Sequence, residues 1–189
     1  MYNRTGLEGE RHGAVPMLRG AALAYARRGV PVFPCEPGGK RPLTRNGFWD
    51  ATTEARRIEA WWARWPGANV GVPTGRRSGL LVLDADPRDG GLDSLTLLER
   101  ERGPLPGTAR ARTGGGGVHV FFAYPAGETV RNSAGLLGAG LDVRGEGGYV
   151  VVPPSRTRGS YEWTDRSPPA GPGWLLARLR ERAGEETLF

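Results

Sequence analysis

The chain has 189 residues and is 38% apolar, which fits one compact domain or two small lobes that share a core. No apolar run is long enough to span a bilayer, and the first residues lack the apolar stretch of a signal peptide. We therefore expect a cytoplasmic protein with no membrane segment. Cys35 is the single cysteine, which excludes an internal disulfide and a multi-cysteine zinc site.

The net charge of +6 favours an anionic partner. Lys40 is the sole lysine, so almost all of the basic charge belongs to arginine, which suits bidentate contacts with phosphate. Abundant arginine, glycine, alanine and proline also arise from a GC-rich coding sequence. Composition leaves both explanations open.

Residues 1–15 are polar and show no period, and we expect a flexible arm there. The spacing of apolar residues predicts helices and strands in the rest of the chain. Helices are expected at 17–28, 53–65, 93–101 and 174–182, and strands at 30–34, 69–73, 80–83, 108–112, 117–123, 141–144, 149–152 and 160–163. The folded domain should cover 16–183, followed by a tail at 184–189. This order of elements predicts an α+β (mixed α/β) fold with a largely antiparallel second half.

The second expected helix has a broad apolar face, on which Ile58, Trp61, Trp62 and Trp65 recur at helical spacing. Thr52 or Thr53 can cap this helix. Aromatic side chains can stack on nucleic-acid bases. This spacing is more typical of packing between a helix and a sheet, and we expect that role here.

The sharpest motif is a strand that ends in two aspartates, Gly79-Leu-Leu-Val-Leu-Asp84-Ala-Asp86. Four apolar residues in a row are typical of a strand buried on both faces. The two carboxylates are two residues apart, so they project to the same side and repel each other unless a cation lies near them. Mg²⁺ and Mn²⁺ bind such carboxylates and keep positions open for phosphates. The plainer alternative is a solvated strand end that turns into Pro87.

A second motif is Leu-Asp142-Val-Arg144, in which the acid and the arginine share one face of a strand. Residues 146–147 indicate the tip of a tight hairpin between the strands at 141–144 and 149–152. The acid and the arginine could be a plain surface ion pair. Beside the two aspartates they would instead supply a third metal carboxylate and a phosphate clamp.

The third motif is Thr113-Gly-Gly-Gly-Gly-Val-His119. Glycines before a strand let backbone N–H groups approach an anion closely, although no Walker sequence follows. His119 alternates with Val118 and Val120, so we expect it on the face opposite the core. A lone histidine on a strand is usually structural, but together with the glycines and the acids it indicates a functional residue.

These three motifs, in this order, resemble those of archaeo-eukaryotic-type primases. The set is most similar to the N-terminal domain of bifunctional DNA primase/polymerases, in the prim-pol superfamily. The likeness runs from about residue 18 to 165 and includes Pro37-Gly-Gly-Lys40-Arg-Pro42, Ala68-Asn-Val-Gly-Val-Pro-Thr-Gly75, Arg131-Asn132-Ser-Ala-Gly135 and Gly147-Gly-Tyr-Val-Val-Val-Pro-Pro-Ser155.

The resemblance implies a primase–polymerase fold, with a catalytic lobe like an RNA-recognition fold and a smaller N-terminal α/β lobe. It implies that Asp84, Asp86 and Asp142 hold two divalent ions, Mg²⁺ or Mn²⁺, and that His119 contacts the phosphates of the incoming nucleotide. Strand geometry adds Arg144 as a triphosphate ligand. The matching stretches and the glycine loop add nucleotide- or template-binding candidates at Lys40, Gly115, Gly116, Gly117, Asn132 and Ser155.

The activity implied is metal-dependent, template-directed nucleotidyl transfer on DNA with nucleoside triphosphates, as a primase, a polymerase or both. Two alternatives stay open: a metal-dependent phosphodiesterase or nuclease that uses the same acids, and a catalytically inactive nucleic-acid-binding module of the same fold. We expect a monomer that binds a DNA template and primer, with room for a separate helicase or template-binding partner.

Overall fold

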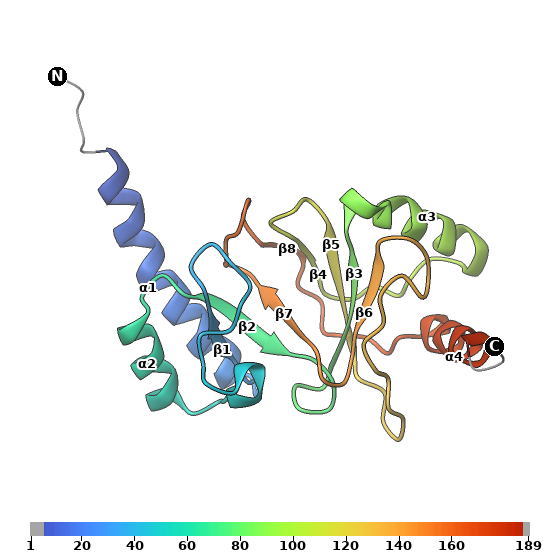
Figure 1. Cartoon of the computed structure of the whole chain (residues 1–189), viewed down its shortest axis with the longest axis horizontal. Helices are drawn as coiled ribbons and strands as arrows, with labels where there is room; N and C mark the ends of the chain where they lie inside the picture. The colour runs from blue at the N-terminus through green and yellow to red at the C-terminus, as the bar shows by residue number, and fades with distance from the viewer. Residues whose placement is uncertain (1–5, 187–189) are drawn as a thin grey trace.

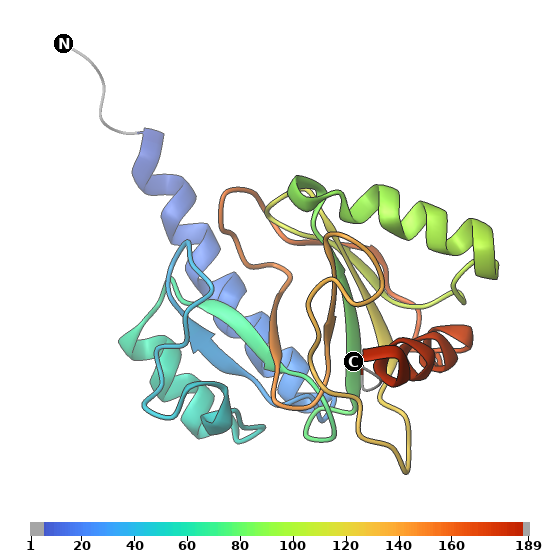
Figure 2. The same ribbon diagram turned by 45° about the vertical axis from the view of Figure 1, so that its right-hand side comes forward.

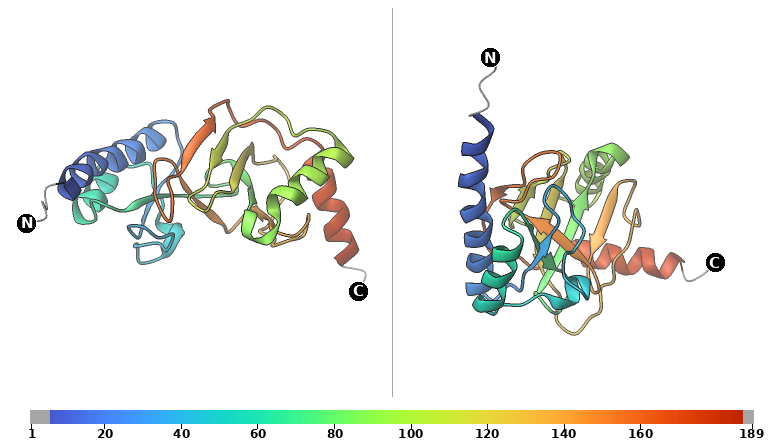
Figure 3. Two further views of the ribbon diagram at one scale, coloured as in Figure 1. Left: turned by 90° about the horizontal axis from the view of Figure 1, so that it is seen from above. Right: turned by 60° about the vertical axis from the view of Figure 1, so that its left-hand side comes forward.

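The computed structural model describes the backbone of residues 6–186 and the side chains of residues 17–182. Over this part of the chain, helices and strands form four layers, with a helix pair at each end and two antiparallel sheets between them (Figure 1; Figure 3). The fold is thus of the mixed α+β class that the order of elements predicts. No helix in the described part of the chain is long and apolar enough to cross a membrane.

The smaller layer of the molecule consists of the helices α1 (Gly6–Arg27) and α2 (Ala55–Arg64) together with a three-stranded sheet. The sheet has the order β1-β2-β7, built from β1 (Phe33–Cys35), β2 (Asn69–Pro73) and β7 (Tyr149–Val152). Ile58 and Trp62 are buried on the face of α2 that meets this layer, and Trp62 donates from Nε1 to the carbonyl of Ala68 at 3.0 Å. The predicted packing role of the tryptophan face is confirmed for Trp62, and Trp61 and Trp65 pack partly buried beside it.

The larger sheet has five strands in the order β6-β3-β5-β4-β8. Its members are β3 (Leu80–Ala85), β4 (Arg110–Arg112), β5 (Val118–Ala123), β6 (Leu141–Arg144) and β8 (Glu162–Asp165). One face packs on α3 (Gly91–Arg102) and α4 (Trp174–Glu186) through Leu95, Leu98, Leu175 and Leu179. The other face turns toward the three-stranded sheet, as Figure 2 shows from a second angle.

Both faces of the central strand β3 are covered, as the run of four apolar residues predicts. Leu81 and Leu83 pack toward α3 and α4, whereas Val82 joins the core around α1 and α2. Two short 3₁₀ helices, η1 (Gly47–Asp50) and η2 (Pro87–Asp89), lie in the loops that border the space between the sheets.

Several predicted boundaries are wrong at the ends of the chain. Helix α1 begins at Gly6, so the expected arm is helical from that residue, while residues 1–5 lie outside the described residues. Helix α4 continues to Glu186 through the expected tail, and residues 187–189 also lie outside the description. At α2 the N-cap is Glu54 without a side-chain cap, because Thr52 instead accepts from the Glu54 N–H at 3.1 Å.

The predicted hairpin between β6 and β7 is also wrong. The two strands have the predicted bounds, but β6 pairs with β3 and β7 pairs with β2, so the chain crosses from one sheet to the other between them. The crossing is held by long-range contacts: Thr74 donates to the Gly145 carbonyl at 2.6 Å, and the Gly145 N–H donates to Asn132 Oδ1 at 2.8 Å. This crossing sets β6 and β7 on the two sides of the space that holds the candidate site.

Candidate active site

The strand register of the five-stranded sheet brings three of the predicted residues side by side. Asp84 on β3 lies opposite His119 on β5 and opposite Asp142 on β6. Residues directly opposite in an antiparallel sheet have Cβ atoms about 4.5–5.5 Å apart, and like charges in that position are destabilising. The two carboxylates therefore need positive groups close by.

Arg144 supplies positive charge there, and His119 also contacts the Asp84 carboxylate. Asp84 Oδ1 lies 3.4 Å from His119 Nε2, and Asp84 Oδ2 lies 3.9 Å from Arg144 Nη2. Burial is the largest influence on the Asp84 carboxyl and acts to raise its pKa. The hydrogen bond and charge of His119, with the charges of Lys40 and Arg144, outweigh burial and lower the pKa overall, so the carboxylate is ionised at neutral pH.

Asp142 and Arg144 lie on one face of β6, as predicted, because the alternate residues Leu141 and Val143 are buried on the other. Arg144 Nη2 lies 2.8 Å from Asp142 Oδ2, and Asp142 Oδ1 accepts from the Gly135 N–H at 3.2 Å. The arginine thus bridges the two carboxylates that the register places opposite each other.

Asp86 takes a different position from Asp84. Its carboxylate caps η2 by accepting from the Arg88 N–H at 3.0 Å and also pairs with the Arg88 guanidinium. That pair is the main reason why the pKa of Asp86 falls to about 2. The plainer alternative, a turn built on the second aspartate, therefore describes Asp86, although Lys40 is close enough to lower the pKa of Asp86 as well as that of Asp84.

A cavity of about 230 Å³ opens beside Asp84, between the two sheets. Five predicted site residues line it: Lys40, Asp84, His119, Asn132 and Arg144. The rest of its wall comes from Phe48, Tyr149, Tyr161 and the segment 147–151. The cavity thus joins loops of the smaller layer to strand residues of the larger sheet.

Lys40 and Asn132 bring free donors to this cavity. Lys40 is exposed and forms no ion pair or side-chain hydrogen bond with a described residue. Its loop is tied down because Asn69 donates to the Gly39 carbonyl at 2.8 Å. Asn132 accepts from the Gly145 N–H through Oδ1, which leaves its amide nitrogen without a partner among the described residues.

His119 lies on the face of β5 that the alternation predicts, but that face is not open to solvent. The side chain is only 3% exposed, because the smaller layer covers this face of the sheet. Its Nδ1 and the hydroxyl of Tyr161 are buried without a hydrogen-bond partner in the described part of the chain. Buried polar atoms are rarely left unpaired, so both atoms on this cavity wall can bond to a ligand or to water.

The structure does not bring Ser155 or the glycine loop onto the cavity wall. Ser155 is fully buried and its Oγ accepts from the Val70 N–H at 2.8 Å, which fixes the end of β7 against β2. In the loop, Thr113 Oγ1 accepts from the Gly117 N–H at 3.0 Å, and a Cβ on Gly117 would overlap the Ala85 carbonyl. Close packing on the end of β3 therefore explains Gly117, while Gly115 and Gly116 are exposed.

Cys35 is fully buried in β1. Burial, helped by the nearby charge of Glu36, raises the pKa of its thiol to about 12. The thiol is thus protonated at neutral pH, as expected of a structural cysteine.

The sequence pattern missed the aromatic part of the cavity. Phe48 lies 5.6 Å from Tyr149 between ring centroids, and Tyr149 lies 5.4 Å from Phe33 in an edge-to-face arrangement. Phe48 and Tyr149 come from segments about 100 residues apart in the chain, so no local spacing relates them. Tyr149 lies within the matching stretch 147–155, whereas Phe48 lies outside every matching stretch and carried no sequence signal.

The resemblance implies that Asp84, Asp86 and Asp142 hold divalent ions, and the geometry of these carboxylates shows which of them suit that role. Asp84 and Asp142 fit as oxygen donors, since they face each other in register and Arg144 now supplies the positive charge that an ion would supply. Asp86 pairs with Arg88, and the described residues contain no group of three or more His, Cys, Asp or Glu side chains that could hold a metal ion. Asp84 and Asp142 are therefore the two carboxylates that the strand register brings together at this site.

Comparison with known proteins identifies the family of the chain. The family described as "Bifunctional DNA primase/polymerase, N-terminal" (Prim-Pol) matches residues 22–174, which is most of the chain. The chain belongs to the Prim-Pol family. Membership implies nucleotidyl transfer of the primase/polymerase type at the level of the family, with DNA and nucleotides as substrates. No curated protein matches the chain with significance.

Proposed function

We propose that this chain catalyses metal-dependent, template-directed transfer of a nucleotide from a nucleoside triphosphate to a DNA primer. The observation that carries the proposal is the cavity of about 230 Å³ in which Lys40, His119 and Arg144 surround the Asp84 carboxylate. Three cationic or donor groups around one carboxylate suit a triphosphate that arrives with a divalent ion. Family membership of residues 22–174 supports the same assignment.

Each residue has a role in binding or orientation. Lys40 is exposed and has no ion-pair partner among the described residues, so its ammonium meets the triphosphate as a point charge. Arg144 turns from Asp142 toward the phosphates, which a planar guanidinium can clamp with two hydrogen bonds. His119 is held by Asp84 through Nε2, which leaves Nδ1, without a partner among the described residues, for a hydrogen bond with the bound nucleotide.

Asp84 and Asp142 would hold the divalent ion, with Asp86 joining them if Arg88 releases it. A Mg²⁺ or Mn²⁺ ion bound there would neutralise the triphosphate and lower the pKa of the primer hydroxyl. Phe48 and Tyr149 would exclude water from the sugar and base, because their packed rings form the apolar side of the same cavity.

The deciding experiment is extension of a labelled primer–template by the purified protein with Mg²⁺ or Mn²⁺ and all nucleotides. Asp84→Ala should lower extension about 10²-fold or more, the range found when one group that stabilises a transition state is removed. Asp84→Asn serves as a closer structural substitute, and Asp93→Ala is the matched control because Asp93 is an exposed acid on α3 away from the cavity. Wild-type rates in both Asp84 variants would refute the site.

A second candidate function rests on the arginines. Asp86 and Asp142 are each neutralised by an arginine two residues later in the chain. Such pairing would suit a non-catalytic module that binds nucleotides or nucleic acid without turnover. Binding of DNA with no metal-dependent extension would favour this module, and shortening of the DNA without added nucleotides would favour a nuclease.

A further inference from the structure

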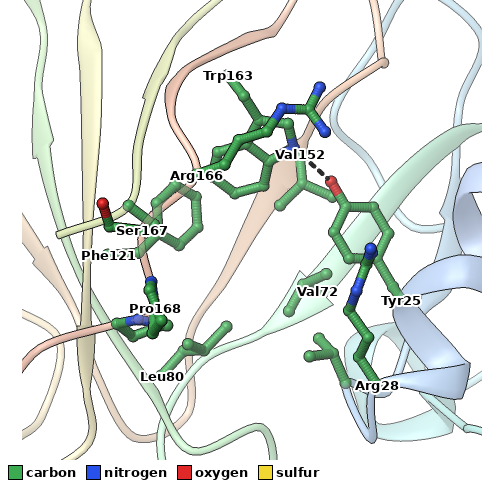
Figure 4. A pocket seen from close by; sticks show the side chains of 13 residues that line it. Tyr25, Arg28, Val72, Leu80, Phe121, Val152, Trp163, Arg166, Ser167 and Pro168 are labelled. Atoms are coloured by element: carbon green, nitrogen blue, oxygen red, sulfur yellow. Dashed lines mark hydrogen bonds between the residues drawn. The ribbon is translucent and has the colours of Figure 1, made fainter.

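A second and larger cavity lies elsewhere between the two sheets, away from the candidate site. Its volume is about 310 Å³, at the lower end of the range of small-ligand pockets. The wall combines three aromatic rings with aliphatic side chains, namely Tyr25, Phe121, Trp163, Val72, Leu80 and Val152 (Figure 4). It does not include any of the residues that surround Asp84.

The aromatic rings are held in place. Tyr25 donates to the Pro153 carbonyl at 2.6 Å and accepts from Trp163 Nε1 at 3.2 Å. Trp163 packs on Phe121 with ring centroids 5.0 Å apart. The polar atoms of Tyr25 and Trp163 are therefore used within the wall, and the ring surfaces are what a ligand would meet.

Two arginines lie on this cavity, Arg28 from the end of helix α1 and Arg166 from the segment after β8. Figure 4 shows the two guanidinium groups apart from each other, with the Tyr25 hydroxyl between them in this view. Burial raises the pKa of Tyr25 to about 12, and both arginines are close enough to oppose that shift. Neither forms an ion pair or a side-chain hydrogen bond with a described residue.

The carboxylate nearest in sequence is engaged elsewhere. Asp165 accepts from the Ser167 N–H at 2.7 Å and lies near Arg110. Two guanidinium groups thus border one apolar cavity, and none of the described residues that line it is acidic. Each guanidinium can donate two hydrogen bonds to a phosphate, so an anion at this end of the cavity would be stabilised by either group.

We propose that this cavity is a second ligand site, which binds a small aromatic phosphate of about mononucleotide size. The flat ring enters among Tyr25, Phe121 and Trp163, where stacking and apolar burial stabilise it. The phosphate lies between Arg28 and Arg166. The ligand touches α1, both sheets and the segment after β8, so it connects the two halves of the fold.

The chemistry has two sources among the substrates of the family: a free nucleotide, or the terminal nucleotide of a DNA strand that carries a 5′-phosphate. Deoxythymidine monophosphate is the probe for the first source, and a 5′-phosphorylated oligo(dT) is the probe for the second. Competition between the two probes decides the source.

The test is calorimetric titration of the full chain with deoxythymidine monophosphate in the presence of a chelator. We expect one site per chain. Thymidine alone and inorganic phosphate alone should each bind at least about tenfold more weakly than the nucleotide, because each lacks one half of the recognised group. Arg28→Gln with Arg166→Gln should weaken the nucleotide at least about tenfold. Both arginines are exposed, so this double variant should keep its fold.

Two controls separate this site from the proposed active site. Arg19→Gln with Arg27→Gln removes the same charge from exposed positions of α1 and should leave the affinity unchanged. Lys40→Gln alters the Asp84 cavity and should also leave it unchanged. Wild-type affinity in the Arg28/Arg166 variant, or loss of binding in the Lys40 variant, would overturn the second site without bearing on catalysis at the first.

Discussion

Asn132 stands where the cavity wall meets the crossing between the two sheets. Its Oδ1 accepts from the Gly145 N–H at 2.8 Å, and Gly148 packs so closely that a Cβ there would overlap the same oxygen. The amide nitrogen is left for a ligand. One side chain thus combines a structural acceptor with a candidate nucleotide donor.

Asn132→Asp separates these two roles. The substitution keeps an oxygen for the Gly145 N–H but places a negative charge where a triphosphate is expected, so KM for the nucleotide should rise about tenfold or more while thermal stability stays near wild type. Steady-state primer extension and thermal unfolding measure the two quantities. Asn132→Ala, which loses both functions, should also lower stability by about 1 kcal/mol. An unchanged KM in Asn132→Asp would leave Asn132 with the structural role alone.

The sequence could predict residues whose position follows from strand periodicity. Asp84, His119, Asp142 and Arg144 each take the face of their strand that alternation assigns, and antiparallel pairing then brings them together. Asp86 lies one residue beyond the strand, where a local cap with Arg88 competes with the cavity for its carboxylate. Periodicity carries no information on that competition, nor on Ser155, whose hydroxyl bonds to a neighbouring strand.

At the scale of elements, the glycine loop between β4 and β5 has two kinds of glycine. A Cβ on Gly117 would overlap the carbonyl oxygen of Ala85 at the end of β3, and it would also meet Pro87 at 3.0 Å. Gly115 is exposed, and its Cβ would meet only Thr113 Oγ1 at 3.9 Å. The loop therefore keeps β5 close to β3 through Gly117 and not through Gly115.

Gly117→Ala should therefore lower the free energy of unfolding by about 1–3 kcal/mol, because the backbone of β3 must move. Gly115→Ala is the matched control and should change it by no more than about 0.5 kcal/mol. Denaturant unfolding of both variants tests this difference. Equal effects would mean that the close packing on Ala85 does not hold the strands together.

The 3₁₀ helix η1 carries Trp49, whose side chain is 58% exposed although it lies next to the cavity residue Phe48. The two rings lie with centroids 4.6 Å apart and planes tilted by 37°, and Arg77 fixes the turn by donating to the carbonyls of Trp49 and Ala51. An exposed, braced indole at the edge of the cavity beside Asp84 is suited to stack on a base of the template.

Trp49→Ala should weaken binding of a primer–template by about 1–3 kcal/mol, the usual loss per stacked base, while Trp49→Phe should retain most of the affinity. Fluorescence anisotropy with labelled DNA measures both. Leu97→Ala, an apolar residue of similar exposure on α3, is the control. If Trp49→Ala binds DNA as tightly as the Leu97 variant, the indole is not a stacking platform.

Element boundaries and element partners differ in how far a sequence can predict them. The bounds of β2, β6 and β7 agree with the prediction because each is a short, regular run between glycines or polar residues. The strand that pairs with β7 differs from the predicted one, because the glycine-rich link between β6 and β7 allows either a hairpin or a crossing between sheets. The choice is made by contacts of Thr74 and Asn132, which lie far from the link in sequence.

At the scale of the whole molecule, three loops from different parts of the chain meet beside the cavity. Asn69 donates to the carbonyls of Gly39 and Arg156, at 2.8 and 2.7 Å, so the Lys40 loop lies against the loop after β7. A Cβ on Gly114 would overlap Thr157 and Gly159, which shows that the glycine loop packs there as well. The net charge of +6 thus includes a basic rim of Lys40, Arg156 and Arg158 at this junction.

The basic rim predicts where DNA enters, which net charge alone does not. Arg156 and Arg158 are exposed and form no ion pair with a described residue, so each is free to neutralise a phosphate. Each such contact with a single strand contributes about 0.7 to the slope of log affinity against log salt. Arg156→Gln with Arg158→Gln should therefore reduce that slope by about 1.4 for a single-stranded template and weaken binding at low salt.

The measurement is DNA binding by fluorescence anisotropy over a series of salt concentrations. Arg19→Gln with Arg27→Gln removes the same charge from α1 and should leave the slope near the wild-type value, because these residues lie away from the junction. Equal slopes in the two double variants would show that DNA responds to the overall charge of the molecule. A smaller slope in the Arg156/Arg158 variant alone would assign the template path to the rim where the three loops meet.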